Sequence, residues 1–435
     1  MKYQLSGFFK KRTKKEYGSL LFFLGIFFLP STLFLSIIFL LPAAILGSFS
    51  NNKNFFKDKW NYPFLIFGIF ISLSAFFQNY FLTNNYSDIW DPSLSLIGLC
   101  NWLPFIYFFW SFQTYIDSPA TRRLLALILV AGTLPIVITG FGQYFFDWTG
   151  PFKTLNGLII WYQKPIENPG GLSGLFSNQN YAGSWLNLVW PFCLAFFLEK
   201  RKNFFKKMVS LGFFLSVGFA AFLTFSRNAW LGLIITFPMM IEKKGLKIFL
   251  TLFFLCFLVL VLILSPIFSG EFQNTLRNIL PQKILLEFAD DGYVGLDSTR
   301  IEIFLSALNL IQLSPIFGTG AASFPAIYFA ETNFWKGHSH NILLELAISF
   351  GIPATLILFL SVGSIMILSG HLIFLENKNN TSIIEKAYWA SLFFFLVSQL
   401  ADIQYFDGRI SLLAWILLAS LKNIIEENNK KEIIN

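Results

Sequence analysis

Two histidines stand close together in a chain that is poor in catalytic side chains. The pentapeptide GHSHN (337–341) holds His338 and His340, which are two of the three histidines in 435 residues. A neutral imidazole can take a proton from a hydroxyl group, so this pair predicts a general base. A zinc site needs a third or fourth ligand, and neither an HExxH pattern nor a suitably spaced carboxylate stands beside them. We therefore expect a site without a metal.

Two arginines lie at positions where a positive charge is energetically unfavourable unless it is compensated. Arg227, in LTFSRNAWLG, lies between two apolar runs, where a charge is costly unless it snorkels to an interface or meets an anion. Arg300, in LDSTRIE, follows the capping residues Asp297 and Ser298 and would open a helix. A cation is unfavourable at the positive end of a helix unless both face an anion such as phosphate. The alternative for Arg300 is an ordinary surface arginine.

The composition indicates an integral membrane protein. Hydrophobic residues make up 55% of the chain and charged residues 13%, and Phe alone occurs 56 times. An average soluble protein has about 25% charged residues. So little polar side chain cannot cover a soluble surface of this size, which excludes a multidomain soluble protein, and so much apolar side chain excludes a disordered one.

The basic residues stand in short runs between the apolar stretches. The net charge is +8, and the runs include KKRTKK (10–15), EKRKNFFKK (199–207) and EKKGLK (242–247). Such runs are typical of cytoplasmic loops of membrane proteins, so we expect no nucleic-acid partner. The three cysteines lie inside apolar runs and are expected to be buried, without a disulfide or a zinc site: Cys100, Cys193 and Cys256.

The apolar stretches predict an all-α fold, a polytopic transmembrane helical bundle of about twelve spans in one membrane domain (1–435). A helix needs about 20 apolar residues to cross the hydrocarbon core. The stretch 19–49 is too long for one span, and Pro30 divides it, since proline disfavours helix at the preceding residue. The predicted spans are 19–30, 32–49, 62–82, 94–116, 120–144, 180–198, 207–225, 228–241, 246–268, 341–369, 383–402 and 408–424.

The lysines and arginines predict the orientation of these spans. With the N-terminus inside, 24 of the 32 lysines and arginines fall in inside segments and 8 in outside segments. This bias predicts cytoplasmic N- and C-termini. The loops 146–179 and 269–340 then both lie outside. Within the second, residues 300–313 have helical apolar spacing (Ile301, Phe304, Leu305, Leu308, Ile311) and predict an amphipathic helix lying against the membrane.

Four stretches in this order resemble the O-antigen ligase and O-antigen polymerase superfamily of bacterial membrane glycosyltransferases. They are GLSGLFSNQNYAGSWLNLVWPF (171–192), TFSRNAWLGL (224–233), DSTRIEIFLSALNLIQLSPIFGTGAASF (297–324) and HSHNILLELAISFGIPATLIL (338–358). The likeness covers roughly residues 170–370. In the last stretch nine residues separate His340-Asn341 from Gly351, as in the family pattern, whereas Ala354 replaces the family's second glycine and Glu345 has no assigned role.

The resemblance implies a periplasmic glycan transfer in lipopolysaccharide or other surface polysaccharide biosynthesis at the inner membrane. The donor would be a glycan on polyprenyl (undecaprenyl) pyrophosphate. The acceptor would be a glycolipid such as lipid A core, a second lipid-linked glycan, or a protein. No metal, cofactor or nucleotide sugar is implied. His340 would be the general base or would position the acceptor, and Arg227 and Arg300 would hold the pyrophosphate. The supporting residues would be His338, Asn341 and Asn180.

Two other classes of function stay open at this point. One branch of the superfamily is described as inorganic-carbon uptake proteins, so the chain could be a transporter of that or another small anion. A transporter should place ionisable residues in mid-membrane and show repeated halves, whereas the notable charges here fall at the outer boundary. A scaffold without activity would not need Arg227, Arg300 and His340 to converge. Ligase and polymerase share these motifs, and the sequence does not separate them.

Overall fold

The computed structural model describes most of the chain in ten stretches. They are residues 13–51, 54–80, 89–166, 170–199, 203–241, 247, 251, 254–255, 300–376 and 382–434. The predicted span 246–268 lies almost entirely outside the described residues. The loop residues 269–299 and Cys256 lie outside them altogether.

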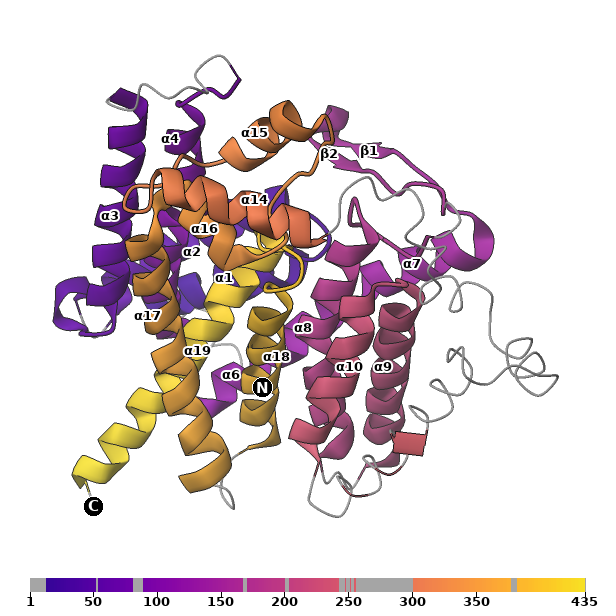
Figure 1. Ribbon diagram of the computed structural model, residues 1–435. Helices are drawn as coiled ribbons and strands as arrows, with labels where there is room; N and C mark the ends of the chain where they lie inside the picture. Colours follow the sequence, from indigo (N-terminus) through magenta and orange to yellow (C-terminus); the bar gives the residue numbers. More distant parts are fainter. Residues whose placement is uncertain are drawn as a thin grey trace.

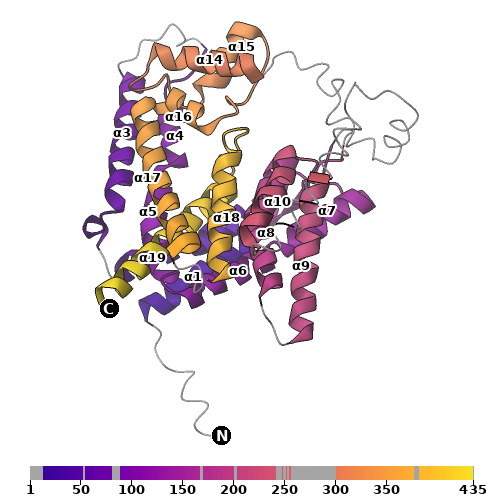
Figure 2. The same ribbon diagram turned by 60° about the horizontal axis from the view of Figure 1, so that its bottom comes forward.

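The described residues fold into a helical bundle (Figures 1 and 2). Its first half comprises α1 (Lys14–Phe28), α2 (Leu33–Ser50), η1 (Phe55–Lys57), α3 (Asn61–Tyr80), α4 (Leu94–Gly98), η2 (Leu99–Asn101), α5 (Leu103–Ser111), η3 (Phe112–Tyr115), α6 (Pro119–Gly132) and α7 (Leu134–Phe146). The second half comprises α8 (Gln179–Leu198), α9 (Phe204–Leu223), α10 (Arg227–Met240), α14 (Arg300–Leu313), α15 (Ser323–Thr332), α16 (Ile342–Phe350), α17 (Ile352–His371), η6 (Leu372–Glu376), α18 (Ile383–Ser398) and α19 (Gly408–Ile434).

Eight helical segments of the described residues are long and apolar enough to cross a membrane. They are Leu33–Ser50, Asn61–Tyr80, Leu94–Tyr115, Pro119–Phe146, Gln179–Leu198, Phe204–Leu223, Ile352–Glu376 and Gly408–Asn429. Three further predicted spans are helices of only 15, 14 and 16 residues, namely α1, α10 and α18. The break predicted at Pro30 is confirmed, because α1 ends at Phe28 and α2 begins at Leu33. The polytopic helical bundle is therefore confirmed, whereas the count of twelve stays a prediction.

The predicted single span 341–369 is wrong, because two helices occupy it. The short α16 ends at Phe350, and α17 begins at Ile352, with Gly351 between them. Gly351 has φ +91°, and a Cβ atom there would lie 1.8 Å from the carbonyl oxygen of Ile316. A residue with a side chain cannot adopt this conformation at such close approach. The glycine thus stops α16 where the turn after α14 crosses it.

Two smaller expectations are also corrected. The loop 146–179 contains an antiparallel hairpin of β1 (Phe152–Thr154) and β2 (Ile159–Trp161), in which Lys153 pairs with Ile160. Cys193 is buried as expected, but Cys100 is exposed, because it lies in the short 3-10 turn η2 between α4 and α5. Neither finding changes the class of fold.

The bundle has two ends of different chemistry. Of the eight long apolar segments, those of α8 and α19 lie deepest in the bundle, since 78% and 89% of them, respectively, are buried. At one end of the bundle, ion pairs join the starts of α1, α6 and α18, namely Lys15–Asp117 and Arg122–Glu385. We call this the opposite end, in contrast to the site end. The first turn of α8 and the loop after α18 meet at the other end through Asn180 and Asp402, and we call it the site end.

At the site end, α14 lies across α16 (Figure 1). The predicted helix 300–313 is confirmed as α14, but part of its predicted apolar face is wrong. Phe304 and Leu305 are exposed, so they remain available to a bilayer as predicted, whereas Ile311 is buried. The stripe that packs against α15 and α16 is Ile303, Ala307, Leu310 and Ile311. One stripe of α14 therefore holds it on the protein while another faces outward.

Candidate functional site

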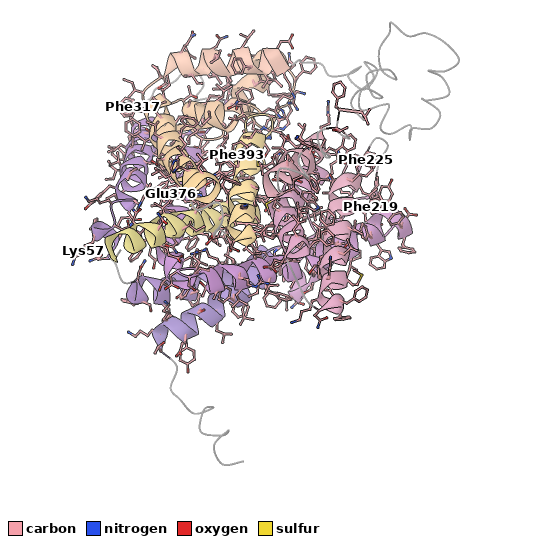
Figure 3. All side chains as sticks on the ribbon, turned by 90° about the horizontal axis from the view of Figure 1, so that it is seen from below. Lys57, Phe219, Phe225, Phe317, Glu376 and Phe393 are labelled. Atoms are coloured by element: carbon pink, nitrogen blue, oxygen red, sulfur yellow. The ribbon has the colours of Figure 1, made fainter. Side chains whose placement is uncertain are left out.

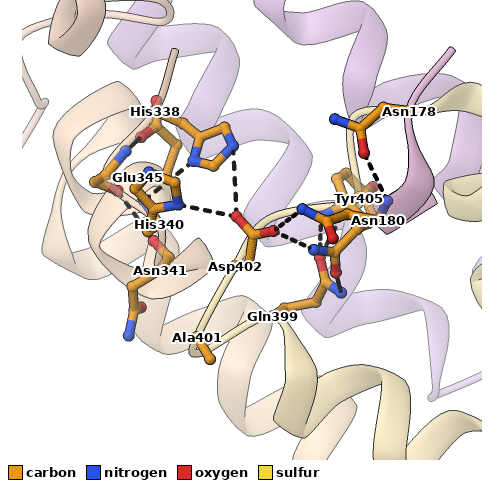
Figure 4. A network of polar contacts seen from close by, with 12 residues as sticks. Asn178, Asn180, His338, His340, Asn341, Glu345, Gln399, Ala401, Asp402 and Tyr405 are labelled. Carbon is orange, nitrogen blue, oxygen red and sulfur yellow. Dashed lines mark hydrogen bonds and ion pairs between the residues drawn. The ribbon is translucent and has the colours of Figure 1, made fainter. Parts of the chain in front are cut away.

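His338 and His340 converge on a carboxylate that the sequence places far away. Asp402 lies in the loop between α18 and α19, and its Oδ1 is 2.9 Å from His340 Nδ1 and 3.8 Å from His338 Nε2 (Figure 4). The two imidazole rings lie edge to face with their centroids 4.5 Å apart. The backbone N–H of His340 donates to His338 Nδ1 at 3.1 Å. We call His338, His340 and Asp402 the histidine–aspartate cluster.

The loop before α16 holds His340 in a left-handed conformation with φ +57°. Asn341 caps α16, since its side-chain oxygen accepts hydrogen bonds from the N–H groups of Leu343 and Leu344. Glu345, in the first turn of the same helix, accepts the N–H of Ser339 at 2.9 Å. Glu345 therefore ties the loop to the first turn of α16. Left-handed backbone costs about 1–3 kcal/mol and persists only where the surroundings fix it, and these contacts do so.

The Asp402 carboxylate is oriented by amides on its other side. Its Oδ2 accepts hydrogen bonds from Gln404 Nε2 at 2.8 Å and from Asn180 Nδ2 at 3.4 Å. Gln404 is itself held by Gln399, which also accepts the N–H of Tyr405 (Figure 4). With Oδ2 held by these amides, Oδ1 faces the two histidines. Asn180, predicted as a supporting residue, thus supports the cluster through Asp402.

The electrostatics of the cluster favour a charged aspartate and neutral His338. Burial alone would raise the pKa of Asp402, but the hydrogen bond from His340 and the nearby His340, His338 and Arg300 outweigh it, so the pKa lies below its usual range. Burial, and then the neighbouring His340, lower the pKa of His338 to about 4, against the opposing effect of Asp402. Burial raises the pKa of Glu345, although Ser339 and His340 act against it.

These contacts assign the protons on both rings. Asp402 is a carboxylate with acceptors only, so His340 carries a proton on Nδ1 and donates it to Oδ1. The second ring nitrogen of a neutral His340, Nε2, then has a free lone pair. His338 Nδ1 accepts the His340 N–H, so neutral His338 carries its proton on Nε2, toward Asp402. The cluster therefore presents one oriented imidazole, that of His340, beside a second, neutral histidine.

The same three side chains could also form part of a metal site. Their ligand atoms lie within 4.8 Å of one another. The sequence argument against a metal was therefore incomplete, since the carboxylate absent near the histidines comes from Asp402. The hydrogen bonds nevertheless fit a metal poorly, because a ligating histidine donates its other ring N–H to an acceptor. His338 Nδ1 instead accepts a hydrogen bond, and its proton-bearing Nε2 is the atom that faces the cluster.

Of the two predicted arginines, Arg300 lies beside the cluster. Its Nη1 donates to the carbonyl oxygen of Ala401 at 3.0 Å, one residue before Asp402. Arg227 is the first residue of α10 and comes to the site end through its helix. A Cβ atom on Gly183 of α8 would lie 2.9 Å from Ala229, so the first turns of α8 and α10 are in contact. Asn180, one turn earlier on α8, contacts Asp402.

Sequence reasoning missed Asp402 and the amides around it. The signal is the polar run QLADIQYFDGR (399–409), which interrupts two apolar stretches and holds two aspartates and two glutamines. Of its charges, only Arg409 bears on the predicted orientation of the spans. Asp402 lies 62 positions after His340, so no local spacing connects them.

The fold and the site define a polytopic helical membrane protein with an acid–base cluster and cationic side chains at one end. Comparison with family models then finds a match to the family described as O-antigen ligase over residues 211–359, about a third of the chain. The match lies within the predicted region 170–370 and supports membership of the O-antigen ligase and polymerase superfamily of membrane glycosyltransferases. The matched segment contains Arg227, Arg300, His338, His340 and Asn341. A search of curated proteins found no match.

Proposed function

We propose that the protein transfers a glycan from a polyprenyl-pyrophosphate donor to an acceptor hydroxyl, as a ligase or a polymerase of surface polysaccharide. The observation that carries the proposal is the hydrogen bond between His340 Nδ1 and Asp402 Oδ1 beside Arg300. It orients a base at a membrane boundary where a cation is also present. The acceptor is a glycolipid, a second lipid-linked glycan or a protein.

In the proposed reaction, His340 Nε2 takes the proton of the acceptor hydroxyl. The acceptor oxygen forms a bond to the anomeric carbon, and the bond from that carbon to the pyrophosphate oxygen breaks. The electron pair leaves with the polyprenyl pyrophosphate, whose negative charge Arg300 and Arg227 stabilise. The ionised Asp402 stabilises the imidazolium that forms at His340, as an oriented carboxylate does for other catalytic histidines. No step uses a metal or a cofactor.

The proposal places the site end on the periplasmic side of the inner membrane. The opposite end gathers Lys14 and Lys15 at the start of α1, Arg122 and Arg123 at the start of α6, and the end of α19. Lysine and arginine favour the cytoplasmic side, which agrees with cytoplasmic N- and C-termini. The family match gives no support to the transporter alternative.

The test is transfer by the purified protein in lipid nanodiscs, with a glycan-linked polyprenyl pyrophosphate as donor. His340→Gln should lower kcat by roughly 10²–10⁴-fold, the usual contribution of a general base. The third histidine, His371, is exposed at the end of α17 and offers a matched control, so His371→Gln should transfer at the wild-type rate. Excess EDTA should leave the rate unchanged. Full activity of His340→Gln would refute the assigned base, and loss of activity in EDTA with recovery on added zinc would refute metal independence.

A further inference from the structure

A cavity opens at the opposite end of the bundle, away from the histidine–aspartate cluster. It encloses about 270 Å³ between α6, α8 and α9. The ion pair of Arg123 and Glu199 joins the start of α6 to the end of α8 beside it. Apart from Lys206 and Ser210, the residues that line the cavity are apolar. It therefore suits a hydrocarbon chain.

Contacts of α9 close the cavity toward the site end and leave it open at the opposite end. The ring of Phe219, labelled in Figure 3, lies 5.9 Å from that of Phe141 on α7. A Cβ atom on Gly218 would lie 2.7 Å from the indole nitrogen of Trp190, so α8 and α9 touch there. Lys206, in the first turn of α9, is exposed and lines the other end of the cavity. The cavity thus opens where α9 begins.

The mouth of this cavity carries a positive charge. The side chain of Lys206 lines it, and a lysine in such a place extends its ammonium group to the membrane interface while its stem stays among apolar groups. The ion pairs that the described residues form at the opposite end use other cations, and none of them involves Lys206. Arg123, at the same end, is already paired with Glu199 and lies over the ring of Phe196.

The dimensions and the surroundings of the cavity fit a lipid of one leaflet. From Lys206 to Phe213, the deepest lining residue of α9, the helix rises about 10 Å. This is less than half of a hydrocarbon core of about 30 Å, so the cavity stays within one leaflet. Phe204 and Phe205, beside the lysine, are 75% and 74% exposed. Exposed aromatic rings next to basic residues are typical of segments that lie in the headgroup region of a membrane.

We propose that this cavity binds a phospholipid with an anionic headgroup, with an acyl chain inside and the phosphate at Lys206. Basic pockets between transmembrane helices on the cytoplasmic side bind such headgroups, and the opposite end is cytoplasmic in the orientation proposed above. A zwitterionic phospholipid has the same hydrocarbon but no net charge to offer the lysine, so the site selects by headgroup. The site does not depend on glycan transfer.

The test counts the lipids bound to the purified protein in detergent by native mass spectrometry. The probes are phosphatidylglycerol and phosphatidylcholine with the same acyl chains, whose headgroups differ in net charge. Lys206→Gln removes the charge at the mouth, and Lys57→Gln is its control, because Lys57 is exposed at the same end and does not line the cavity. Leu127→Trp narrows the cavity. Leu124→Trp is its control: both leucines lie on α6 and are 43% exposed, but only Leu127 lines the cavity.

The wild type should bind one phosphatidylglycerol at least tenfold more tightly than phosphatidylcholine. Lys206→Gln should lose this preference, whereas Lys206→Arg should keep it. Leu127→Trp should weaken phosphatidylglycerol binding at least tenfold, and neither control should differ from the wild type. Equal affinity of the wild type for the two lipids would overturn the proposal, and so would equal losses in a variant and its control. A wild-type dimer that Leu127→Trp dissociates would overturn it too, since a second copy would then fill the cavity.

Discussion

Both ends of the bundle bury charged side chains, but they pair them differently. At the opposite end, Arg122 is 1% exposed and contacts Glu385 at 2.7 Å and Glu427 at 2.8 Å. Lys422, equally buried, contacts Asp58, Gln113 and Glu426. At the site end, one carboxylate, Asp402, serves two histidines and two amides. The arginine beside it bonds to a backbone carbonyl.

The difference separates charges that are matched within the fold from charges that stay available at the candidate site. Each buried cation of the opposite end faces more than one carboxylate of the protein, so its charge is matched within the fold. These pairs join α6 and η1 to α18 and α19. At the site end, none of the ion pairs among the described residues involves Arg300. His340 contacts Asp402 through Nδ1, so its other ring nitrogen, Nε2, faces away from this carboxylate. The positive charge of Arg300 and the Nε2 lone pair of His340 are therefore available to a ligand at this end.

The largest expected effect is the loss of stability when Arg122, at the opposite end, is replaced. Arg122→Met should destabilise the folded protein by roughly 3 kcal/mol, the lower end of the cost of breaking a buried pair, because it leaves two partly buried carboxylates without their shared cation. Thermal unfolding of the purified protein in detergent measures the loss. Arg123 is a neighbouring control: its ion pair with Glu199 (2.8 Å from Nη2 to Oε2) is partly exposed. Arg123→Met should cost at most about 1 kcal/mol. Equal losses would show that burial does not distinguish these pairs.

Asp402→Asn should have a smaller effect, on turnover rather than on folding. The donors Gln404 and Asn180 both face the Oδ2 position, so the new amide will place its oxygen there. Its NH₂ group then faces His340 Nδ1, which must become an acceptor and leave the proton on Nε2. That tautomer cannot accept a proton from the acceptor hydroxyl. We expect kcat to fall roughly 10²-fold, about 2.7 kcal/mol.

Because Asp402 acts through His340, the donor KM of this variant should stay near that of the wild type. A general loss of structure would instead raise KM and lower the yield of folded protein. Asp117→Asn at the opposite end, where the aspartate pairs with Lys15 and is 43% exposed, should change neither constant. An Asp402→Asn enzyme with wild-type kcat would refute the assigned tautomer.

Much of this architecture could be predicted from local pattern. Hydropathy located most of the long apolar segments, and Pro30 the break between α1 and α2, because a span must be long and apolar. The end of α19 was predicted ten residues too early, and the short α15 was not predicted. The break at Gly351 could not be predicted in the same way. It depends on the close approach of the Ile316 carbonyl, which is a tertiary contact across 35 positions. The stretch 341–369 is apolar on both sides of that contact.

The site shows the same limit. Histidine and arginine are rare in this sequence, so His340 and Arg300 stood out, and the structure does bring both to one place. Asp402 carried no such signal, since its neighbours in 399–409 look like an ordinary loop. It also lies outside the matched residues 211–359. What makes it part of the site is the folding of α19 and α18 against α8, which only a structure can reveal.

The smallest expected effect distinguishes the two histidines by the pH dependence of thermal stability and of the reaction rate. Burial lowers the pKa of His338 to about 4, whereas an unfolded histidine titrates near 6.5. The stability that neutral His338 contributes is therefore present above about pH 6.5 and is lost as the pH falls toward 4. Between pH 7 and 5, the wild type should lose more thermal stability than His338→Gln, which has no such proton to take up. Over pH 5.5–8 the charge of His338 does not change, so this variant should keep the shape of the pH–rate profile. A pH–rate profile that changes shape in His338→Gln would show that His338 changes charge in this range, contrary to its lowered pKa.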